Sequence, residues 1–314
     1  MPRVAVVGHV EWIEFARVPR VPHPGEIVHV SEWWEEVGGG GAVAAVQLVK
    51  LAGQCDFFTA LGDDERARRS AERLAAHGVR VHAAARGGPQ RRGFTHIDGD
   101  GERTITVIGE RIVPHGDDPL PWELLSEIDG VYFTGGDPGA LRAARRARAL
   151  VATPRADATL LSAGVRLDAL VRSGGDAGAL RAARRAKVVV ATPRTGDALF
   201  ESGVQLDVLV RSGSDAGEDV DPATLDPPPR TVVTTLGGDG GRWDGAAGSG
   251  TWEPQALPGP RVDAYGAGDS FAAGLTTGLA AGLDIAGAVR LGARCGAANM
   301  TGRGPYAGQL DLRP

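Results

Sequence analysis

The segment with the clearest chemical character is DAYGAGDSFAAGL, residues 263–275, where a glycine-rich turn runs directly into a helix of small residues. The backbone N–H groups of Gly266, Ala267 and Gly268 can converge on an anion at that helix start, and glycine allows close approach. A carboxylate at Asp269 would repel a bound phosphate unless it takes a proton from an attacking hydroxyl group. The segment therefore predicts an anion site with Asp269 as a base, and the alternative is that Asp269 is an ordinary N-cap.

Two further segments place glycines next to regular structure. TVVTTLGGDGG, residues 231–241, is typical of a buried strand that ends in a glycine cluster, which suits a nucleotide at the carboxyl edge of a sheet. EVGGGGAVAAVQLVKLAG, residues 36–53, puts four glycines before a helix. Residues 39–44 match the dinucleotide-binding pattern formally, but the preceding VSEWWEE is too polar for a buried parallel strand. No GxxxxGK[ST] segment occurs, so the motif of P-loop kinases is absent.

The composition favours a globular enzyme and argues against several other classes. A chain of 314 residues with 42% hydrophobic content can bury a sizeable core. Its 47 glycines have no three-residue period, and a net charge of −5 gives no field that attracts nucleic acid. Cys55 and Cys295 alone cannot build a disulfide framework, which favours a reducing cytoplasm. The first residues are typical of a buried strand, and no apolar run is long enough to span a membrane.

The order of the elements predicts an α/β sheet. Short β-rich runs alternate with segments of helical period along most of the chain. Residues 11–37 and 91–109 instead alternate polar and apolar side chains, the second around a DGDG turn, which predicts a small sheet outside the main one. Trp33 and Trp34 are adjacent there and must face opposite ways, so one is expected to cover a substrate and the other to pack on a partner.

The middle of the chain is duplicated, with residues 139–177 repeated at 178–216 at an offset of 39 residues. Each copy is expected to form helix, strand, helix and strand. The arginines of its helices are expected to form solvated faces rather than a nucleic-acid surface. We expect one copy to be a peripheral addition, because such an insert can only extend a sheet edge or displace its own equivalent.

In this order the three glycine-rich segments resemble the ribokinase-like (PfkB) family of carbohydrate kinases. The resemblance spans nearly the whole chain and includes residues 59–79, and GAGDSF at 266–271 is the most specific motif. It implies a single α/β domain over residues 1–314, with a doubly wound, mainly parallel sheet and a β-sheet lid from about 11–37 and 91–109. It also implies an ATP-dependent kinase acting on a hydroxyl of a sugar or related small molecule, with Mg²⁺ and room for a monovalent cation, and a homodimer formed through the lid.

The resemblance also assigns individual residues. Asp269 should be the catalytic base, and Gly266, Ala267 and Gly268 should form the anion hole for the transferred phosphoryl group. The residues expected beside the nucleotide are Thr235, Gly237, Gly238, Gly240 and Asn299. Those expected to bind the substrate are Glu11, Gly38, Gly39, His96, Asp137 and again Asp269. Asp215 is preferred to Asp176 for the metal, because the second repeat copy lies nearer in sequence to the nucleotide strand. His9 is a further candidate for substrate contact, although a lone histidine in a strand is more often structural.

Four positions depart from the family pattern. Val43 stands where the family usually has a substrate-binding asparagine, and Ile13 where it has an aspartate, with Glu11 and Glu14 on either side. The NxxE segment is represented only by residues 212–215 or 173–176, and Tyr265 replaces a threonine, which is of no consequence if only its backbone is used. The substrate therefore cannot be named from the sequence. The alternatives are a nucleoside kinase, a non-catalytic sugar- or nucleotide-binding relative, and a nicotinamide-dependent oxidoreductase.

Overall fold

The computed structural model of the protein describes most of the chain outside the duplicated region. The described residues are 1–137, 140, 143, 149–152, 169–173, 188–192, 208–212, 221–224, 228, 231–236, 239–245 and 248–313. The predictions for Gly237, Gly238, Asp176 and Asp215 fall outside these residues.

The first sheet is parallel throughout and carries the N-terminal strand at its centre. Its order is β5-β4-β1-β8-β9, formed by β5 (Val79–Ala85), β4 (Cys55–Leu61), β1 (Val4–Val7), β8 (Gly130–Phe133) and β9 (Ala149–Ala152). Every residue of β1, β4 and β8 is buried. Strands that are covered on both faces need continuous apolar sequence, which explains why VAVV and CDFFTAL do not alternate.

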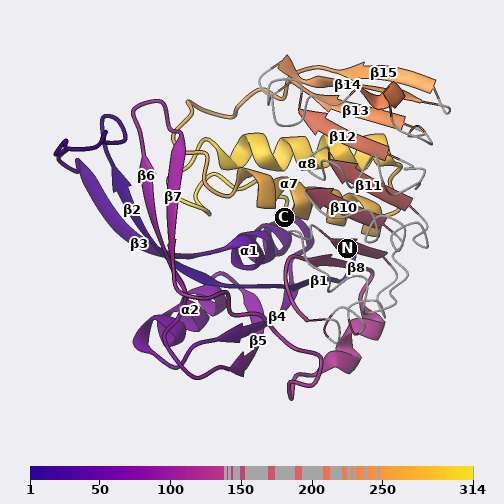
Figure 1. The fold of residues 1–314 in the computed structure, drawn as a ribbon. Helices are drawn as coiled ribbons and strands as arrows, with labels where there is room; N and C mark the ends of the chain where they lie inside the picture. Colours follow the sequence, from indigo (N-terminus) through magenta and orange to yellow (C-terminus); the bar gives the residue numbers. More distant parts are fainter. Residues whose placement is uncertain are drawn as a thin grey trace.

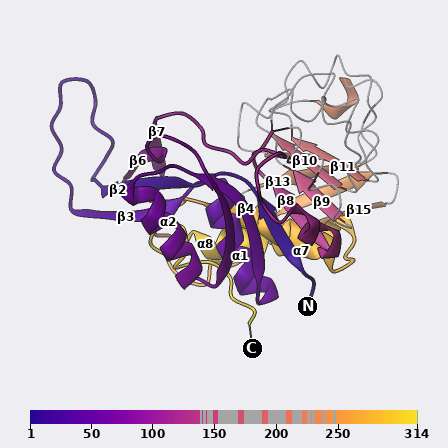
Figure 2. The same cartoon turned by 90° about the horizontal axis from the view of Figure 1, so that it is seen from below.

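The second sheet continues the first, since β9 contacts β10 (Figure 2). Its strands follow in chain order, namely β10 (Ala169–Ser173), β11 (Val188–Thr192), β12 (Val208–Ser212), β13 (Thr231–Thr235), β14 (Gly241–Gly245) and β15 (Gly248–Trp252). The strands β10 to β13 are parallel, and the hairpin of β14 and β15 is antiparallel. The α/β sheet predicted from the sequence is therefore confirmed.

The two repeat copies lie side by side inside this arrangement. The first contributes β9 and β10, the second contributes β11 and β12, and all four strands stand between β8 and β13. The expectation that one copy is a peripheral addition at an edge is wrong for these strands. The paired strands on both sides run parallel, so a tandem copy can be inserted without reversing any neighbour.

Four α-helices complete the described main body. They are α1 (Gly40–Ala52), α2 (Glu65–Ala76), α7 (Ala267–Ala280) and α8 (Ile285–Asn299), and two short 3₁₀ helices, η1 (Trp122–Glu127) and η4 (Pro222–Thr224), lie on connections. The helices α1 and α7 pack against each other and on the first sheet, and α8 packs on α7 (Figure 1). The helix α2 packs on β5 and on the lid strands β2 and β3. Among the described residues, no helix combines the length and apolarity needed to cross a membrane.

The lid is a separate four-stranded sheet of order β3-β2-β6-β7. It consists of β2 (Glu11–Arg17), β3 (Glu32–Gly38), β6 (Arg92–Ile97) and β7 (Arg103–Ile108), all within or directly next to the two segments predicted from sequence. The pair β2–β6 is parallel and the others are antiparallel. The lid stands away from the main sheet, and the connection between β2 and β3 extends furthest from the body (Figures 1 and 2).

The register of the lid defines its two faces. Ile13 pairs with Gly93 and Phe15 with Thr95, so these four residues share one face, which we call the inner face because Phe15 packs on Tyr265. The two tryptophans face opposite ways, as predicted. Trp34 is buried and stacks on Phe15, and Trp33 is 57% exposed. Trp34 thus belongs to the core rather than to an open substrate surface.

Candidate active site

The N-terminus of α7 is shaped by two glycines with different surroundings. Gly266 is the N-cap with φ 81°, and a Cβ added there would lie 2.8 Å from Cγ1 of Val43, so only glycine fits. A Cβ on Gly268 would meet no atom within 4 Å, so the helix start is open at that point. Gly266 is the N-cap and Asp269 is the third residue of the helix, and therefore the N-cap alternative is wrong.

The amides of this turn are oriented as at other helix starts. The first helical hydrogen bond runs from Ser270 N to Gly266 O at 2.9 Å, so the amides of the residues between them have no acceptor within the helix. Ala267 N lies 3.4 Å from Ala264 O, which occupies it in part. An anion that approaches Gly268 would meet the positive end of the helix dipole.

Two buried side chains, Asp263 and Asn299, hold this loop in position through hydrogen bonds. Asp263 accepts hydrogen bonds from Tyr265 N at 2.6 Å and Gly304 N at 2.8 Å, and its burial raises the pKa of the carboxyl group. Asn299 is completely buried, donates to Tyr265 O at 2.7 Å and accepts from Ser270 Oγ at 3.0 Å. Both ends of the Asn299 amide therefore hold this loop, and the predicted contact of Asn299 with the nucleotide stays a prediction.

The side chain of Tyr265 joins this loop to the lid and to α1. Its hydroxyl group accepts a hydrogen bond from Gly39 N at 3.1 Å, and its ring meets Phe15 edge-on at 5.0 Å between centroids. Burial raises the pKa of this phenol, so it stays neutral. Tyr265 packs in one cluster with Ile13 and Val43, the residues that replace the expected aspartate and asparagine. The side chain of Tyr265 therefore matters as well as its backbone, because its ring packs in the apolar cluster that contains the two altered positions.

The carboxylate of Asp269 lies over the start of α1. A Cβ on Gly40 would come within 2.9 Å of Asp269 Oδ1 and 3.1 Å of Thr134 Oγ1, and so glycine at this position leaves room for both groups. Gly40 N lies 3.4 Å from Nε2 of His9. The glycine segments predicted at 36–53 and 263–275 therefore meet at Asp269, together with Thr134, which follows β8 and carries no recognisable motif.

A buried polar cluster continues from this point. Glu11 Oε1 lies 3.0 Å from Nε of Arg91 and 3.9 Å from Nε2 of His9, and all three side chains are largely buried. Arg111 Nη2 lies 3.0 Å from His9 Nδ1 and donates to Thr134 O at 2.6 Å. Glu11 is thus connected to Asp269 through His9 and Gly40, and its role in substrate binding stays a prediction, whereas no pattern in the sequence marks Arg91 and Arg111.

Two predicted substrate residues lie elsewhere. His96 pairs with Ala16 on the outer face of the lid, where its ring contacts Phe94, so the prediction that it contacts the substrate disagrees with its placement. Oδ1 of Asp137 accepts hydrogen bonds from Gly116 N and Ala140 N, both at 2.7 Å. Asp137 therefore holds backbone in place, as a cap does, instead of facing the site.

The predicted nucleotide and metal positions are only partly described. Thr235 ends β13, and Gly240 closes the hairpin turn, with its carbonyl accepting a hydrogen bond from Leu236 N at 2.8 Å. In the part of the chain that is described, no group of three His, Cys, Asp or Glu side chains could hold a metal ion.

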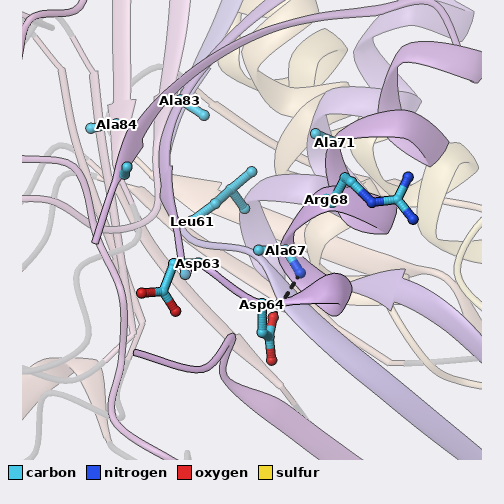
Figure 3. A pocket seen from close by; sticks show the side chains of 10 residues that line it. Leu61, Asp63, Asp64, Ala67, Arg68, Ala71, Ala83 and Ala84 are labelled. Atoms are coloured by element: carbon cyan, nitrogen blue, oxygen red, sulfur yellow. Dashed lines mark hydrogen bonds between the residues drawn. The ribbon is translucent and has the colours of Figure 1, made fainter. Parts of the chain in front are cut away.

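A hollow of about 300 Å³ lies beside α2 and is a poor candidate for the site (Figure 3). Alanines of α2 and β5 form much of its wall, and Asp64 is occupied in capping Ala67 N at 3.0 Å. Arg68 is paired with Glu65 and Glu72. No set of polar groups converges there.

Comparison with known proteins gives a family match over nearly the whole chain. Residues 1–311 match the family described as pfkB family carbohydrate kinase. Fructoselysine 6-kinase of Escherichia coli (strain K12) is 38% identical over 77 residues, which are 24% of this chain and 28% of that protein. The ATP-dependent ribose-1-phosphate kinase of Halopiger xanaduensis is 29% identical over 153 residues, 46% of this chain and 50% of the relative. The matched segments thus span half or less of these curated relatives.

Solved structures show the same fold over nearly the whole chain. A ribokinase from Thermotoga maritima has a TM-score of 0.65 and 19% identity, covering 99% of this chain and 97% of the other. The adenosine kinase from Sinorhizobium meliloti has a TM-score of 0.65 and 17% identity, with coverage of 97% and 95%. The fold is that of ribokinase, and the chain belongs to the pfkB family of carbohydrate kinases.

Proposed function

We propose that the protein is a phosphotransferase that moves the γ-phosphate of ATP to a hydroxyl group of a sugar or related small molecule. The observation that carries this proposal is the position of the Asp269 carboxylate, which lies in the first turn of α7, beside open Gly268 and over Gly40. A hydroxyl group bound there would have a base on one side and an anion-binding helix start on the other. Phosphoryl transfer requires chiefly this kind of positioning and charge stabilisation.

In this scheme Asp269 accepts the proton of the attacking hydroxyl group. The helix start at Gly266, Ala267 and Gly268 stabilises the charge on the transferred phosphoryl group. His9 and Glu11 bind and orient the acceptor, and Tyr265 keeps the loop docked on Gly39. The nucleotide is expected at the end of β13, near Thr235 and Gly240.

We expect Mg²⁺ to enter the reaction as part of the nucleotide complex. Mg²⁺ commonly keeps several waters and binds through one or two carboxylates together with substrate phosphates. Asp215 and a monovalent cation stay predictions. We also propose a cytoplasmic location, since Cys55 and Cys295 are both free thiols.

A turnover screen tests the proposal. Purified protein is incubated with ATP·Mg²⁺ and a panel of sugars, sugar phosphates and nucleosides, and ADP formation is followed, with Asp269→Asn as the inactive control. Acceptor-dependent ADP release by the wild-type protein alone is the expected result. Binding of ATP without any turnover would instead favour a non-catalytic relative, and binding of NAD but no ATP would favour an oxidoreductase.

A further inference from the structure

A cavity of about 660 Å³ lies at the base of the lid, next to the proposed acceptor site. Its walls come from the first turn of α2, from residues 86–92 and from the segment 108–115 that follows β7. The volume is in the range of small-molecule pockets. Four arginines and two carboxylates line it, so its charged groups are predominantly positive.

Two of these arginines are held by carboxylates outside the cavity. Arg86 pairs with Asp118 at 2.7 Å, and Arg92 pairs with Glu14 at 3.2 Å. Of the two carboxylates in the wall, Asp64 accepts the capping hydrogen bond of α2. These groups shape the cavity, and their charges are largely satisfied within the protein.

Arg66 differs from the other arginines. It forms no ion pair with any described residue, and its Nε is buried without a hydrogen-bond partner. A buried donor without an acceptor is unfavourable, and buried cationic groups are normally paired. An acceptor atom supplied by a ligand in the cavity would satisfy it.

Arg111 connects the cavity to the acceptor site. It lines the cavity, while its Nη2 lies against His9 Nδ1 and Thr134 O. His9 in turn contacts Gly40, over which Asp269 lies. The cavity and the proposed acceptor site thus lie on either side of the contact between Arg111 and His9, and an acceptor that uses both has to reach past this contact.

We propose that the acceptor carries an anionic group, a phosphate or a carboxylate, which binds in this cavity at Arg66 and Arg111. Guanidinium groups suit both anions because they donate two parallel hydrogen bonds. This inference rests on the proposed kinase function and narrows its substrate class. Neutral sugars are expected to be poor acceptors, since they leave Arg66 without a partner.

Matched acceptor pairs test the inference. The pairs are ribose and ribose 5-phosphate, fructose and fructose 6-phosphate, and glucose and glucuronate, so that one arm reports phosphate and another reports carboxylate. We expect the anionic member of at least one pair to have a kcat/KM higher by about 10- to 100-fold, the range for hydrogen bonds to charged groups. Arg66→Gln should reduce that ratio by about tenfold. Arg68→Gln, on the same helix but paired with Glu65 and Glu72, should leave it unchanged.

Binding measurements separate failure of this inference from failure of the kinase proposal. Calorimetry on Asp269→Asn with the same six compounds requires no turnover, and Arg66→Gln is introduced into that background for comparison. Binding of an anionic compound that depends on Arg66 supports the cavity assignment even if no phosphoryl transfer is found. The inference is overturned if neither turnover nor binding favours an anionic member, or if the preference survives Arg66→Gln unchanged.

Discussion

At the scale of single residues, the site combines groups with opposing requirements. In the proposed reaction a base must reach the acceptor hydroxyl group without repelling the phosphate, and we expect Asp269 to do so from the first turn of α7, where the helix dipole favours an anion. His9 and Glu11 are buried nearby, with Arg91 beside the Glu11 carboxylate. In this proposal one element, the start of α7, serves both the proton and the phosphate.

Asp269→Asn is expected to lower kcat by about 10²- to 10⁴-fold while the Kd of ATP changes little, because the side chain acts on the proton rather than on the nucleotide. Asparagine keeps the shape and remains compatible with a helix start, so the thermal midpoint should be nearly unchanged. Steady-state kinetics and ATP titration measure the two effects. Wild-type turnover in this variant would remove Asp269 from the mechanism.

From the sequence alone, only residues that belong to one continuous motif could be placed next to each other. The glycines and Asp269 belong to continuous segments, so their proximity follows from the turn itself. Thr134 and Arg111 come from segments without a pattern, and only the tertiary fold brings them together. The face on which His96 lies was not predictable from its motif, since neighbouring strand residues face opposite sides and a shift of one position reverses the face.

At the scale of elements, the start of α7 depends on two glycines for separate reasons. Gly266 must adopt a left-handed conformation against Val43, whereas Gly268 has space around it. The first requirement concerns folding, and the second concerns access of a ligand. Substitution by alanine should therefore distinguish them.

Gly266→Ala should destabilise the protein by about 1–3 kcal/mol, the usual cost of a strained backbone conformation. Gly268→Ala should change stability by less than about 1 kcal/mol, because alanine is favoured over glycine inside helices. Its new methyl group should nevertheless lower ATP-dependent turnover, since it enters the open space at the helix start. Thermal melts and kinetics on both variants provide the test. An active Gly268→Ala protein would place the phosphate elsewhere.

The lid and the repeat show which element properties were predictable. Alternation of polar and apolar residues identified the lid segments, and β6 shows the matching alternation of buried and half-buried residues. Such alternation could not predict the position of the duplicated strands within the main sheet. All strands of a parallel sheet have similar apolar sequences, so pattern does not distinguish an edge position from an interior one.

At the scale of the whole molecule, the lid leaves two sheet edges and several apolar side chains exposed. All six residues of β7 are exposed, including Ile105 at 41% and Val107 at 44%, and Trp33 on the opposite edge strand β3 is 57% exposed. Open strand edges with apolar side chains favour association with another chain. The lid is therefore the part of the described surface best suited to bind a second copy.

We expect the protein to be a homodimer through the lid, with a mass by light scattering close to twice 32.5 kDa at micromolar concentration. Val107→Asp should shift the mass toward that of the monomer, because a dimer would have to bury the new charge without a partner. Leu283→Asp is the matched control, since Leu283 is 45% exposed in the turn between α7 and α8, outside the lid. Both substitutions lie at exposed positions, so circular dichroism should show folded protein in each case. A wild-type chain that remains monomeric under these conditions would show that the lid edges are protected in some other way.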